Sequence, residues 1–420
     1  MNIFKNNIIL KIYKYKYRFL LYLFRKNINS FWFRFTPLFS GKNKYSSVSH
    51  KYNQKKTILI VDSNIPKYNC SAGERTTWQY IDMFSEMGFD VFFMPDDFKE
   101  IQPYTQELLN KGIKCLCGDW YEKYYDIWIM KNGCKLDYVL LNRPMVAVKY
   151  IDLLKKYSNA RIIYYGMDIH HIRESEQYKI TNDFEHFKLS EYFKKIELYL
   201  YEKADAILTV STEEESVIKG YGYNNIDVFP VYFYKNFNAA EYVPNQRNNM
   251  LFVGGEKHPP NPDAVMWFIK DILPEFIKEI QDVKFIVVGH YGNDFVEKYS
   301  SKNVRFIVSA DDEKLKEIYN SVKIVVVPLR FGAGIKGKTI EAGYYGIPVV
   351  STKFGLEGLP EISEILSSKN TAEEFKNELV TIYNDDVKLK EMSLKFSEYV
   401  KNRFSYEKAV GKIKSVLRNQ

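Results

Sequence analysis

From residue 57 onward, the chain alternates short apolar runs with longer segments in which apolar residues recur every three or four positions. The short β-branched runs predict buried strands, and the longer amphipathic segments predict helices. The predicted strands are Thr57–Asp62, Asp90–Pro95, Asp137–Asn142, Arg161–Gly166, Asp205–Ser211, Met250–Gly255, Val283–Gly289, Val304–Ser309, Lys323–Pro328 and Ile347–Ser351. The predicted helices are Gly73–Met87, Pro144–Tyr157, Phe184–Lys203, Asp263–Ile280 and Gly337–Tyr345. Apolar strands that alternate with helices are typical of parallel sheets covered on both faces.

The strand and helix pattern pauses at a polar stretch, residues 245–249, and then starts again. We interpret this stretch as a hinge between two doubly wound, Rossmann-like α/β domains that face a cleft. The predicted domains span residues 51–244 and 245–385. Residues 386–420 are expected to be helical and to pack back toward the N-terminal domain, and residues 1–50 form a separate basic helical segment.

The composition is that of a globular protein, because 46% of the 420 residues are hydrophobic and 27% are charged. This excludes disordered and fibrous classes. The net charge of +8 is uneven: residues 1–61 hold 13 Lys/Arg and no acid, whereas the rest holds 47 Lys/Arg against 52 Asp/Glu. A mildly acidic body argues against a nucleic-acid groove. The four cysteines lack a zinc spacing and favour a reducing, cytoplasmic setting over a disulfide framework.

Residues 1–50 carry ten Lys/Arg and no acidic residue. The longest apolar run, Phe19–Phe24, is too short to span a bilayer, and no small-residue cleavage site follows it. On a helical wheel, four cations share one arc opposite six bulky apolar residues, although Lys16 interrupts the apolar side. The pattern predicts a helix that lies on an anionic membrane surface, at the inner face of the cell membrane. A basic tail, or a helix packed on the body of the protein, is the alternative.

The stretch Pro328–Ser351 follows a predicted strand and opens into a predicted helix, with three glycines, Gly332, Gly334 and Gly337, at the start of that helix. The glycines let the backbone approach a ligand, and Lys336 and Lys338 place two cations at a helix N-terminus, which suits a diphosphate. Glu341, one turn into the helix, could accept hydrogen bonds from a ribose diol. The candidate donor-binding residues are Gly254, Gly255, Arg330, Gly332, Gly334, Lys336, Lys338 and Glu341.

Three other interpretations of this stretch remain. The spacing of Gly332, Gly337, Lys338 and Thr339 resembles a P-loop, but a P-loop normally follows the first strand of its domain and this stretch follows about the fourth. The glycines also have the spacing of a dinucleotide fingerprint, which again comes late and lacks a ribose carboxylate some 20 residues on. The third interpretation is a glycine-rich turn with surface lysines that binds no ligand.

A second loop closes the first strand of the C-terminal half, and Gly254 and Gly255 would admit a ligand close to its backbone. Asn261 or Asp263 could cap the following helix, with Pro262 in the first turn. A tight turn with a helix cap, and no ligand contact, explains the prolines and Asn261 equally well.

In the N-terminal half, Gly73 and Arg75 follow the first strand, and Asp168, His170, His171, Arg173 and Glu174 follow another. Histidine carries protons near neutral pH, and a nearby carboxylate orients it. We predict that one histidine packs and that His170, with Asp168, faces the cleft. A zinc site is the weaker alternative, because the i,i+4 histidine pair and a cysteine partner are missing. The candidate catalytic residues are His170, Asp168 and Lys338, and the candidate acceptor-binding residues are Gly73, Arg75 and Arg173.

These motifs resemble those of the retaining family-4 glycosyltransferases of the GT-B fold, over residues 57 to about 405. The resemblance is carried by Pro328–Ser351, Phe252–Ala264 and Ala204–Ser211. It implies transfer of a sugar from a nucleotide diphosphate sugar, with retention, to a glycan or lipid-linked glycan in polysaccharide synthesis. It also implies donor binding in the C-terminal domain and acceptor binding in the N-terminal one. Because no D-x-D occurs, no metal or other cofactor is expected.

The chain departs from the family pattern at two positions. Family members commonly carry a glutamate eight residues before the position of Glu341, where this chain has Ala333, and an arginine where it has Gly255. We expect Lys336 and Lys338 to supply the missing charge, and loop amides to replace the first glutamate. A nucleotide-sugar 2-epimerase of the same architecture, or a non-catalytic membrane-docking protein, remains the alternative.

Overall fold

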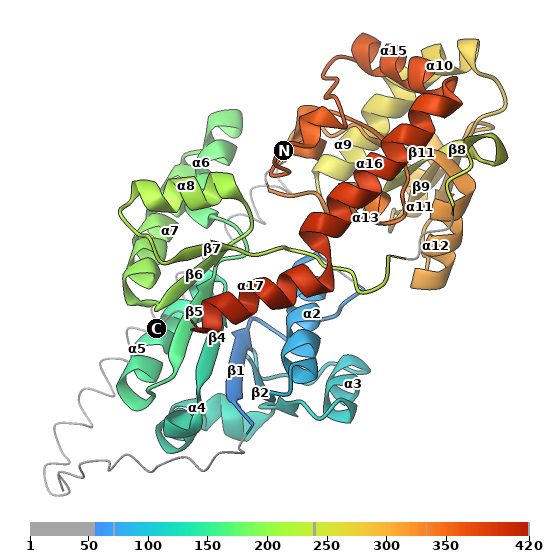
Figure 1. Cartoon of the computed structure of the whole chain (residues 1–420). Helices are drawn as coiled ribbons and strands as arrows, with labels where there is room; N and C mark the ends of the chain where they lie inside the picture. Colours follow the sequence, from blue (N-terminus) through green and yellow to red (C-terminus); the bar gives the residue numbers. More distant parts are fainter. Residues whose placement is uncertain (1–54, 70–71, 238–240, 333, 419–420) are drawn as a thin grey trace, which may run out of the picture. The chain divides into compact units, whose positions relative to one another are not determined.

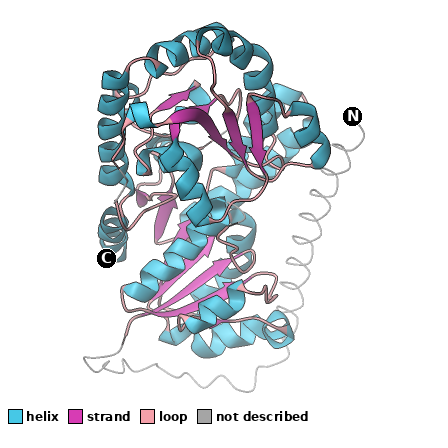
Figure 2. Ribbon diagram, turned by 90° about the vertical axis from the view of Figure 1, so that its right-hand side faces the viewer, coloured by secondary structure: helices cyan, strands magenta, loops and turns pink. Residues whose placement is uncertain are grey.

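The structure is a computed structural model, and it describes residues 55–69, 72–237, 241–332 and 334–418 (Figure 1). The chain divides into two compact units. The first ends at residue 208 and adds residues 222–226, and the second comprises residues 209–221 and everything from 227 onward. In each unit, helices cover both faces of a sheet (Figure 2). The predicted membrane-surface segment, residues 1–50, lies outside the described residues.

The first unit is built on a seven-stranded sheet with the order β3-β2-β1-β4-β5-β6-β7. Strand β1 lies between β2 and β4 and runs parallel to both, so that Leu59 is paired with Phe92 on one side and with Val139 on the other. The side chains of β1 from Ile58 to Val61 are completely buried. The strands are β1 (Thr57–Asp62), β2 (Asp90–Pro95), β3 (Lys114–Cys115), β4 (Tyr138–Asn142), β5 (Arg161–Tyr165), β6 (Ala206–Thr209) and β7 (Ile226–Val228).

The helices of the first unit begin at residues suited to that position. Pro144 opens one helix, where its missing N–H costs nothing, and the side chain of Asp183 accepts a hydrogen bond from Glu185 N at the start of another. The helices are α2 (Ala72–Glu86), α3 (Tyr104–Asn110), α4 (Asp119–Asn132), α5 (Pro144–Tyr157), α6 (His170–Thr181) and α7 (Phe184–Lys203), with a 3₁₀ turn at Gly133–Lys135.

The second unit contains a five-stranded parallel sheet with the order β10-β9-β8-β11-β12. The strands are β8 (Asn248–Val253), β9 (Phe285–Val288), β10 (Val304–Ile307), β11 (Val322–Val327) and β12 (Val349–Ser351). The helices are α8 (Thr212–Gly220), α9 (Pro260–Trp267), α10 (Leu273–Glu279), α11 (Asn293–Tyr299), α12 (Asp312–Ser321), α13 (Gly337–Tyr344), α14 (Lys353–Leu356), α15 (Ala372–Tyr383), α16 (Asp386–Phe404) and α17 (Tyr406–Arg418), with 3₁₀ turns at Pro244–Gln246 and Ile362–Glu364. Two doubly wound parallel sheets confirm the predicted fold class.

One predicted helix, Asp263–Ile280, is divided in the structure. It comprises α9, a π-helical turn at Phe268–Ile272, and α10. Pro274 lies in the first turn of α10 and cannot donate a backbone hydrogen bond to the preceding turn. The wider π turn accommodates that missing donor, and the apolar face of the segment stays buried through Phe268, Ile272 and Phe276.

The boundary between the units does not lie at residue 245 as predicted, because residues 227–244 belong to the second unit. Tyr234 stacks on Tyr344 with ring centroids 3.9 Å apart, which ties this segment to α13. Residues 386–420 are likewise part of the second unit. Helix α16 packs directly on α13, since a Cβ added at Gly343 would lie 2.5 Å from Cγ2 of Val400.

Candidate functional site

In both sheets the strand order reverses between the first and the fourth strand of the unit, β1 and β4 or β8 and β11. Doubly wound sheets bind ligands beyond the carboxyl ends of the strands at such a switch point. In the second unit, the loops that leave β8 and β11 carry the predicted donor-binding residues. The fold therefore brings two stretches about 75 residues apart in sequence to one edge of the sheet.

Lys338 is the central cation of this edge. Its Nζ donates to Oδ1 of Asn261 at 2.7 Å and lies 4.0 Å from the centroid of the Phe252 ring. No carboxylate forms an ion pair with Lys338 in the described part of the chain. Burial, followed by the charge of Lys336, lowers the pKa of Lys338 to about 7. A partly buried ammonium group without a paired carboxylate in the described residues is well suited to bind an anion.

Lys336 lies beside it at the N-terminus of α13 and is 7% exposed. Its Nζ lies 3.1 Å from Oε2 of Glu357 and donates to the carbonyl oxygen of Gly334. Burial lowers the pKa of Lys336, while Glu357 opposes that change. His258, in the loop after β8, also has a lowered pKa because of burial and of the charges of Lys338 and Lys336. A positive potential therefore covers this edge.

The loop after β8 approaches Lys338 as closely as the backbone allows. A Cβ at Gly254 would lie 2.7 Å from Nζ of Lys338, and one at Gly289 would lie 2.5 Å from the carbonyl oxygen of Gly254. Backbone hydrogen bonds fix the loop, with Gly254 N donating to Val288 O at 2.8 Å. Glycine at position 289 is therefore required by the contact between the end of β9 and this loop, and glycine at position 254 leaves room for the Lys338 and Asn261 side chains.

Glu341 lies one turn into α13 and is 8% exposed. Its Oε2 accepts a hydrogen bond from the Tyr319 hydroxyl at 3.0 Å, and Tyr319 stacks on Tyr345 with centroids 4.4 Å apart. Burial, together with Glu341, raises the pKa of Tyr319 far above its usual value, so the phenol remains a donor. The structure thus orients the Glu341 carboxylate, while its contact with a ribose stays a prediction.

One predicted role in this region is wrong. Neither Asn261 nor Asp263 caps α9, because the helix begins at Pro260 with Pro259 as its N-cap. Asn261 instead donates to Gly255 O at 2.9 Å and so joins the glycine loop to Lys338. Arg330 forms a two-point ion pair with Asp263, at 2.9 Å for its Nε, and its contact with a donor stays a prediction.

The other predicted glycines shape the loop between β11 and α13. Gly332, at φ +125°, lies where a Cβ would be 3.4 Å from Pro260 Cγ and 3.7 Å from Lys336 Cε. Gly334, at φ +76°, presents its carbonyl oxygen to Lys336. Both adopt backbone conformations that other residues reach only with strain. They allow the loop to fold back onto the first turn of α9.

In the first unit, the β1/β4 switch point holds a buried polar cluster that sequence reasoning missed. Asp62, at the end of β1, accepts hydrogen bonds from Arg143 Nε at 2.6 Å, from Thr77 Oγ1 at 2.6 Å and from Asn142 Nδ2 at 3.2 Å. Asp62 is 2% exposed. The sequence does contain a signal for this cluster. The otherwise apolar strand β4 ends in the polar residue Asn142, and a second polar residue, Arg143, follows it.

Arg143 has a strained backbone, with φ 62° and ψ 136°. A side chain with a Cβ reaches such values at a cost of about 1–3 kcal/mol, and residues of this kind gather at functional sites. The predicted acceptor residue Gly73 lies in the first turn of α2, where a Cβ would be only 3.0 Å from Nη2 of Arg143. Glycine at this position therefore makes room for the guanidinium group.

The two histidines differ as predicted in their surroundings. His171 is buried, and its Nδ1 lies 2.6 Å from Oε2 of Glu197, a fully buried carboxylate on α7. Glu197 also accepts the backbone N–H groups of both histidines and thereby caps α6, a role that the sequence did not reveal because α6 and α7 meet only in the fold. The His170 side chain is 13% exposed, and its Nδ1 lies 2.8 Å from Oδ1 of Asp168.

Asp168 links His170 to Arg173, a predicted acceptor residue, which forms an ion pair with it and lies 3.6 Å from Glu174. Burial alone would raise the pKa of Asp168, but His170 and Arg173 outweigh it and hold the pKa well below the usual range. An ionised Asp168 fixes the Nδ1–H tautomer of His170, which leaves Nε2 as a proton acceptor. Arg75, the remaining predicted acceptor residue, lies half-buried in the first turns of α2.

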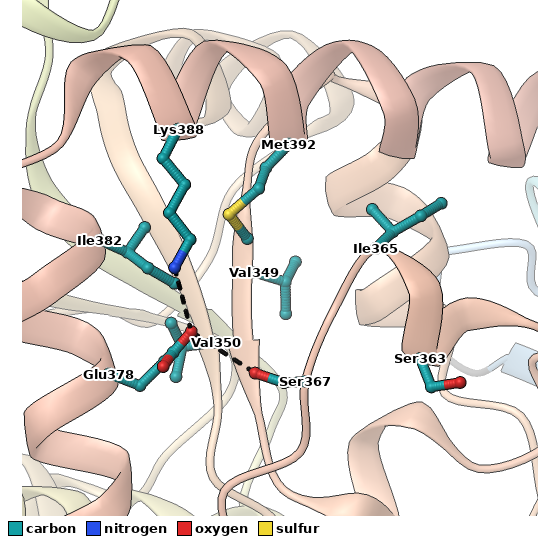
Figure 3. Close-up of a pocket in the computed structure, with 9 residues that line it drawn as sticks. All are labelled: Val349, Val350, Ser363, Ile365, Ser367, Glu378, Ile382, Lys388 and Met392. Atoms are coloured by element: carbon teal, nitrogen blue, oxygen red, sulfur yellow. Dashed lines mark hydrogen bonds and ion pairs between the residues drawn. The ribbon is translucent and has the colours of Figure 1, made fainter.

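A separate cavity of about 140 Å³ lies in the second unit between β12, the segment 363–367 and helices α15 and α16 (Figure 3). Its apolar wall includes Val349, Ile382 and Met392. Three of its polar side chains pair with one another, since Ser367 Oγ lies 3.4 Å, and Lys388 Nζ 3.8 Å, from Oε1 of Glu378. None of the predicted site residues lines it.

Two further features bear on the predictions. In the described ranges, no group of three or more His, Cys, Asp or Glu side chains is arranged to hold a metal ion. The helices of the same ranges include none that combines the length and hydropathy needed to cross a bilayer.

The two parallel-sheet units, each with a polar site at its switch point, define the GT-B architecture. Solved structures with this fold include a sucrose-phosphate synthase from Thermosynechococcus elongatus, with 14% identity, a TM-score of 0.64, and coverage of 87% of this chain and 98% of that one. HepE of Anabaena, solved in complex with UDP-glucose, has 14% identity and a TM-score of 0.62, and the match covers 87% of this chain and all of HepE. At a sequence identity of 14%, the similarity to these structures shows that the fold is shared and nothing about activity.

The second unit matches a family in sequence as well. Residues 247–385 match the family model described as "Glycosyl transferases group 1". A curated relative, an uncharacterized 44.6 kDa protein in the cps region of Klebsiella pneumoniae, is 26% identical over 243 residues. That match covers 54% of this chain and 61% of the Klebsiella protein, so the chain aligns with under two thirds of its relative.

Proposed function

We propose that the protein is a retaining hexosyltransferase that moves a sugar from a nucleotide diphosphate sugar to a glycan or lipid-linked glycan during cell-surface polysaccharide synthesis. The observation that carries the proposal is Lys338, a partly buried cation at the switch point of the segment that matches the glycosyl transferases group 1 model. Within the described residues it has no carboxylate partner. The UDP-glucose complex of HepE and the cps-region location of the Klebsiella relative support the donor class and the pathway.

The chemistry follows from where charge develops. As the bond between the sugar and the diphosphate breaks, the sugar gains positive and the diphosphate negative charge. Lys336, Lys338 and the first N–H groups of α13 are fixed donors for that leaving group. A preorganised donor of this kind lowers a barrier by about 3 kcal/mol. No carboxylate is assigned as a nucleophile, so the acceptor hydroxyl attacks from the face that the diphosphate leaves.

On the acceptor side, His170 is the proposed proton acceptor. Asp168 orients its imidazole through Nδ1, and the partly exposed ring leaves Nε2 for the acceptor hydroxyl. Arg173 keeps Asp168 ionised, so the carboxylate does not take up that proton itself. In this proposal, Gly73, Arg75 and Arg173 contribute to binding the acceptor.

The proposal is tested by incubating the full chain with a panel of UDP-, GDP- and TDP-sugars and a membrane extract as the acceptor source. We expect extract-dependent release of one nucleoside diphosphate and, by proton NMR, a product with the anomeric configuration of the donor. An inverted product would exclude retention. A changed sugar without transfer would identify the alternative activity, a nucleotide-sugar epimerase.

Transfer is expected to continue in a chelator. Because two lysines and a helix N-terminus neutralise the diphosphate in this proposal, a divalent cation is not needed for that role. The release rate in 5 mM EDTA should remain within about twofold of the untreated rate, a difference of only about 0.4 kcal/mol in barrier height. Loss of activity that Mn²⁺ or Mg²⁺ restores would contradict the lysine-based mechanism.

Donor affinity is expected to depend on pH through Lys338. A bound diphosphate favours the protonated amine and raises its pKa above the value of about 7 in the free protein. The dissociation constant should therefore be flat below pH 7 and increase by up to about tenfold per pH unit above it. Calorimetry from pH 6 to pH 9 measures this change. Lys338→Arg should remove the dependence, and a constant affinity in the wild type would contradict the role of Lys338.

Residues 1–50 are proposed to bind the anionic inner face of the cell membrane. Each basic residue near such a surface contributes about 1 kcal/mol, an attraction that salt screens over about 8 Å. Deletion of residues 1–50 should release the protein from anionic liposomes and leave donor binding unchanged. Co-sedimentation in 0.1 M and 0.5 M salt is the measurement, and liposome binding that ignores salt and anionic lipid content would exclude the electrostatic interaction.

A further inference from the structure

The polar cluster around Arg143 has a conformation that packing alone does not explain. Arg143 ends β4 at a positive φ of 62°, where a glycine would avoid the strain. Its Nε is held by Asp62 at 2.6 Å, and Asp62 is held in turn by Thr77 and Asn142. This arrangement fixes an arginine at the carboxyl edge of the sheet, beside the switch point between β1 and β4.

The cluster contains hydrogen-bond donors and a hydrogen-bond acceptor that are not used within the described structure. The Nη1 and Nη2 groups of Arg143 have no recorded hydrogen-bond partner in the described ranges, and the side chain is 29% exposed. Oδ1 of Asn142 is buried and also lacks a partner in the described structure. A buried acceptor of this kind is costly unless something satisfies it, which points to a ligand or water that completes the cluster.

The charges in the cluster favour a neutral ligand. Asp62 is paired with Arg143 and Asp168 with Arg173, and Glu74 lies 3.9 Å from Lys67. These three carboxylates and three cations balance one another, so the three pairs carry no surplus positive charge that would attract an anion. The Nη groups of Arg143 are donors, and Oδ1 of Asn142 is an acceptor, at the same partly exposed edge. Neighbouring hydroxyl groups of a sugar ring can both accept and donate hydrogen bonds, so they match this pair.

We propose that Arg143 is a saccharide-binding residue, and that its Nη groups donate to the hydroxyls of a neutral sugar at the β1/β4 edge of the first unit. Asp62 acts as a positioning residue that holds the guanidinium through Nε. The inference rests on the proposed glycosyltransferase function, since the sugar bound here is the acceptor.

Two reactions of the same enzyme separate this role from a structural one. Hydrolysis of the nucleotide sugar uses water as the acceptor and needs no acceptor-binding residue, whereas transfer to a sugar does. The probes are the nucleotide sugar that the wild type hydrolyses, a panel of neutral methyl glycosides, and the matching uronic acids. In Arg143→Gln, kcat/KM for transfer to a neutral glycoside should fall at least tenfold, with hydrolysis within twofold of the wild type.

Matched variants complete the test. Arg143→Gly relieves the positive φ and should also lose transfer while retaining hydrolysis, and Arg305→Gln, which removes an exposed arginine on β10, should change neither reaction. Unchanged transfer in Arg143→Gln, an equal loss of hydrolysis, or wild-type transfer only to uronic acids would overturn the inference. If the wild type neither hydrolyses nor transfers any nucleotide sugar, the proposed function itself fails, and the inference with it.

Discussion

Replacement of Lys338 by alanine is expected to weaken nucleoside diphosphate binding at least tenfold, about 1.4 kcal/mol. The Lys338 amine is partly buried, lies against the Phe252 ring and has a pKa of about 7, so an anion gains more from it than from a fully solvated surface lysine. Glu341→Ala should cause a comparable loss, because the Glu341 carboxylate is held by Tyr319 at 3.0 Å beneath the same loop. Calorimetric titration with the nucleoside diphosphate measures both effects.

The melting temperature separates lost binding from lost folding in these variants. Lys338→Ala removes a partly buried charge that no carboxylate pairs with in the described residues, and it should not lower the melting temperature. Lys316→Ala, on the exposed side of α12, is the matched control and should bind the nucleotide like the wild type. Wild-type affinity in both Lys338→Ala and Glu341→Ala would refute the assignment of this site.

Gly289→Ala is expected to impair both stability and donor binding. The new Cβ would lie 2.5 Å from the carbonyl oxygen of Gly254, and the φ of +151° disfavours alanine as well. Because the obstructing atom belongs to the backbone, the Gly254 loop must shift away from β9. Overpacking of this kind typically costs about 1–3 kcal/mol, and the shifted loop should bind a nucleotide at least tenfold more weakly.

Gly411→Ala provides the control for that substitution. Gly411 lies within α17, and apart from its chain neighbours and the backbone of its own helix no atom of the described residues lies within 4 Å of the position that its Cβ would occupy. Alanine there should stabilise the helix by up to about 1 kcal/mol and leave nucleotide binding unchanged. Thermal unfolding and calorimetry on both variants make the comparison. Equal nucleotide affinity in Gly289→Ala and the wild type would show that the loop does not depend on close packing at β9.

The strands that form the middle of each sheet were predictable because burial on both faces makes them continuously apolar. Thr57–Asp62 and Asp90–Pro95 have the predicted bounds. Strands β3 and β7 were missed, since they have only two and three residues and lie at the edges of their sheet. Their pairing depends on neighbouring strands and leaves almost no periodic pattern in the sequence.

The loops of the second unit were predictable for a different reason. Their glycines and lysines are local in sequence, and the carboxyl end of a parallel strand has a known place in the fold. The partners that complete each site were not predictable, because they come from distant segments. Asp62 and Arg143 are 81 residues apart, and Glu197 reaches His171 across 26 residues. Asn261 was expected to cap a helix, but the prolines around it start α9 without a side-chain cap.

Hydrogen–deuterium exchange of the full chain, with and without a nucleoside diphosphate, tests the central claim most directly. The measurement compares UDP, GDP, ADP and TDP at saturating concentration in a buffer that contains EDTA. We predict that at least one of them protects residues 252–259 and 334–341 and that Lys338→Ala abolishes this protection. Protection confined to the β1/β4 edge of the first unit, or protection of the loops that survives in Lys338→Ala, would contradict the account.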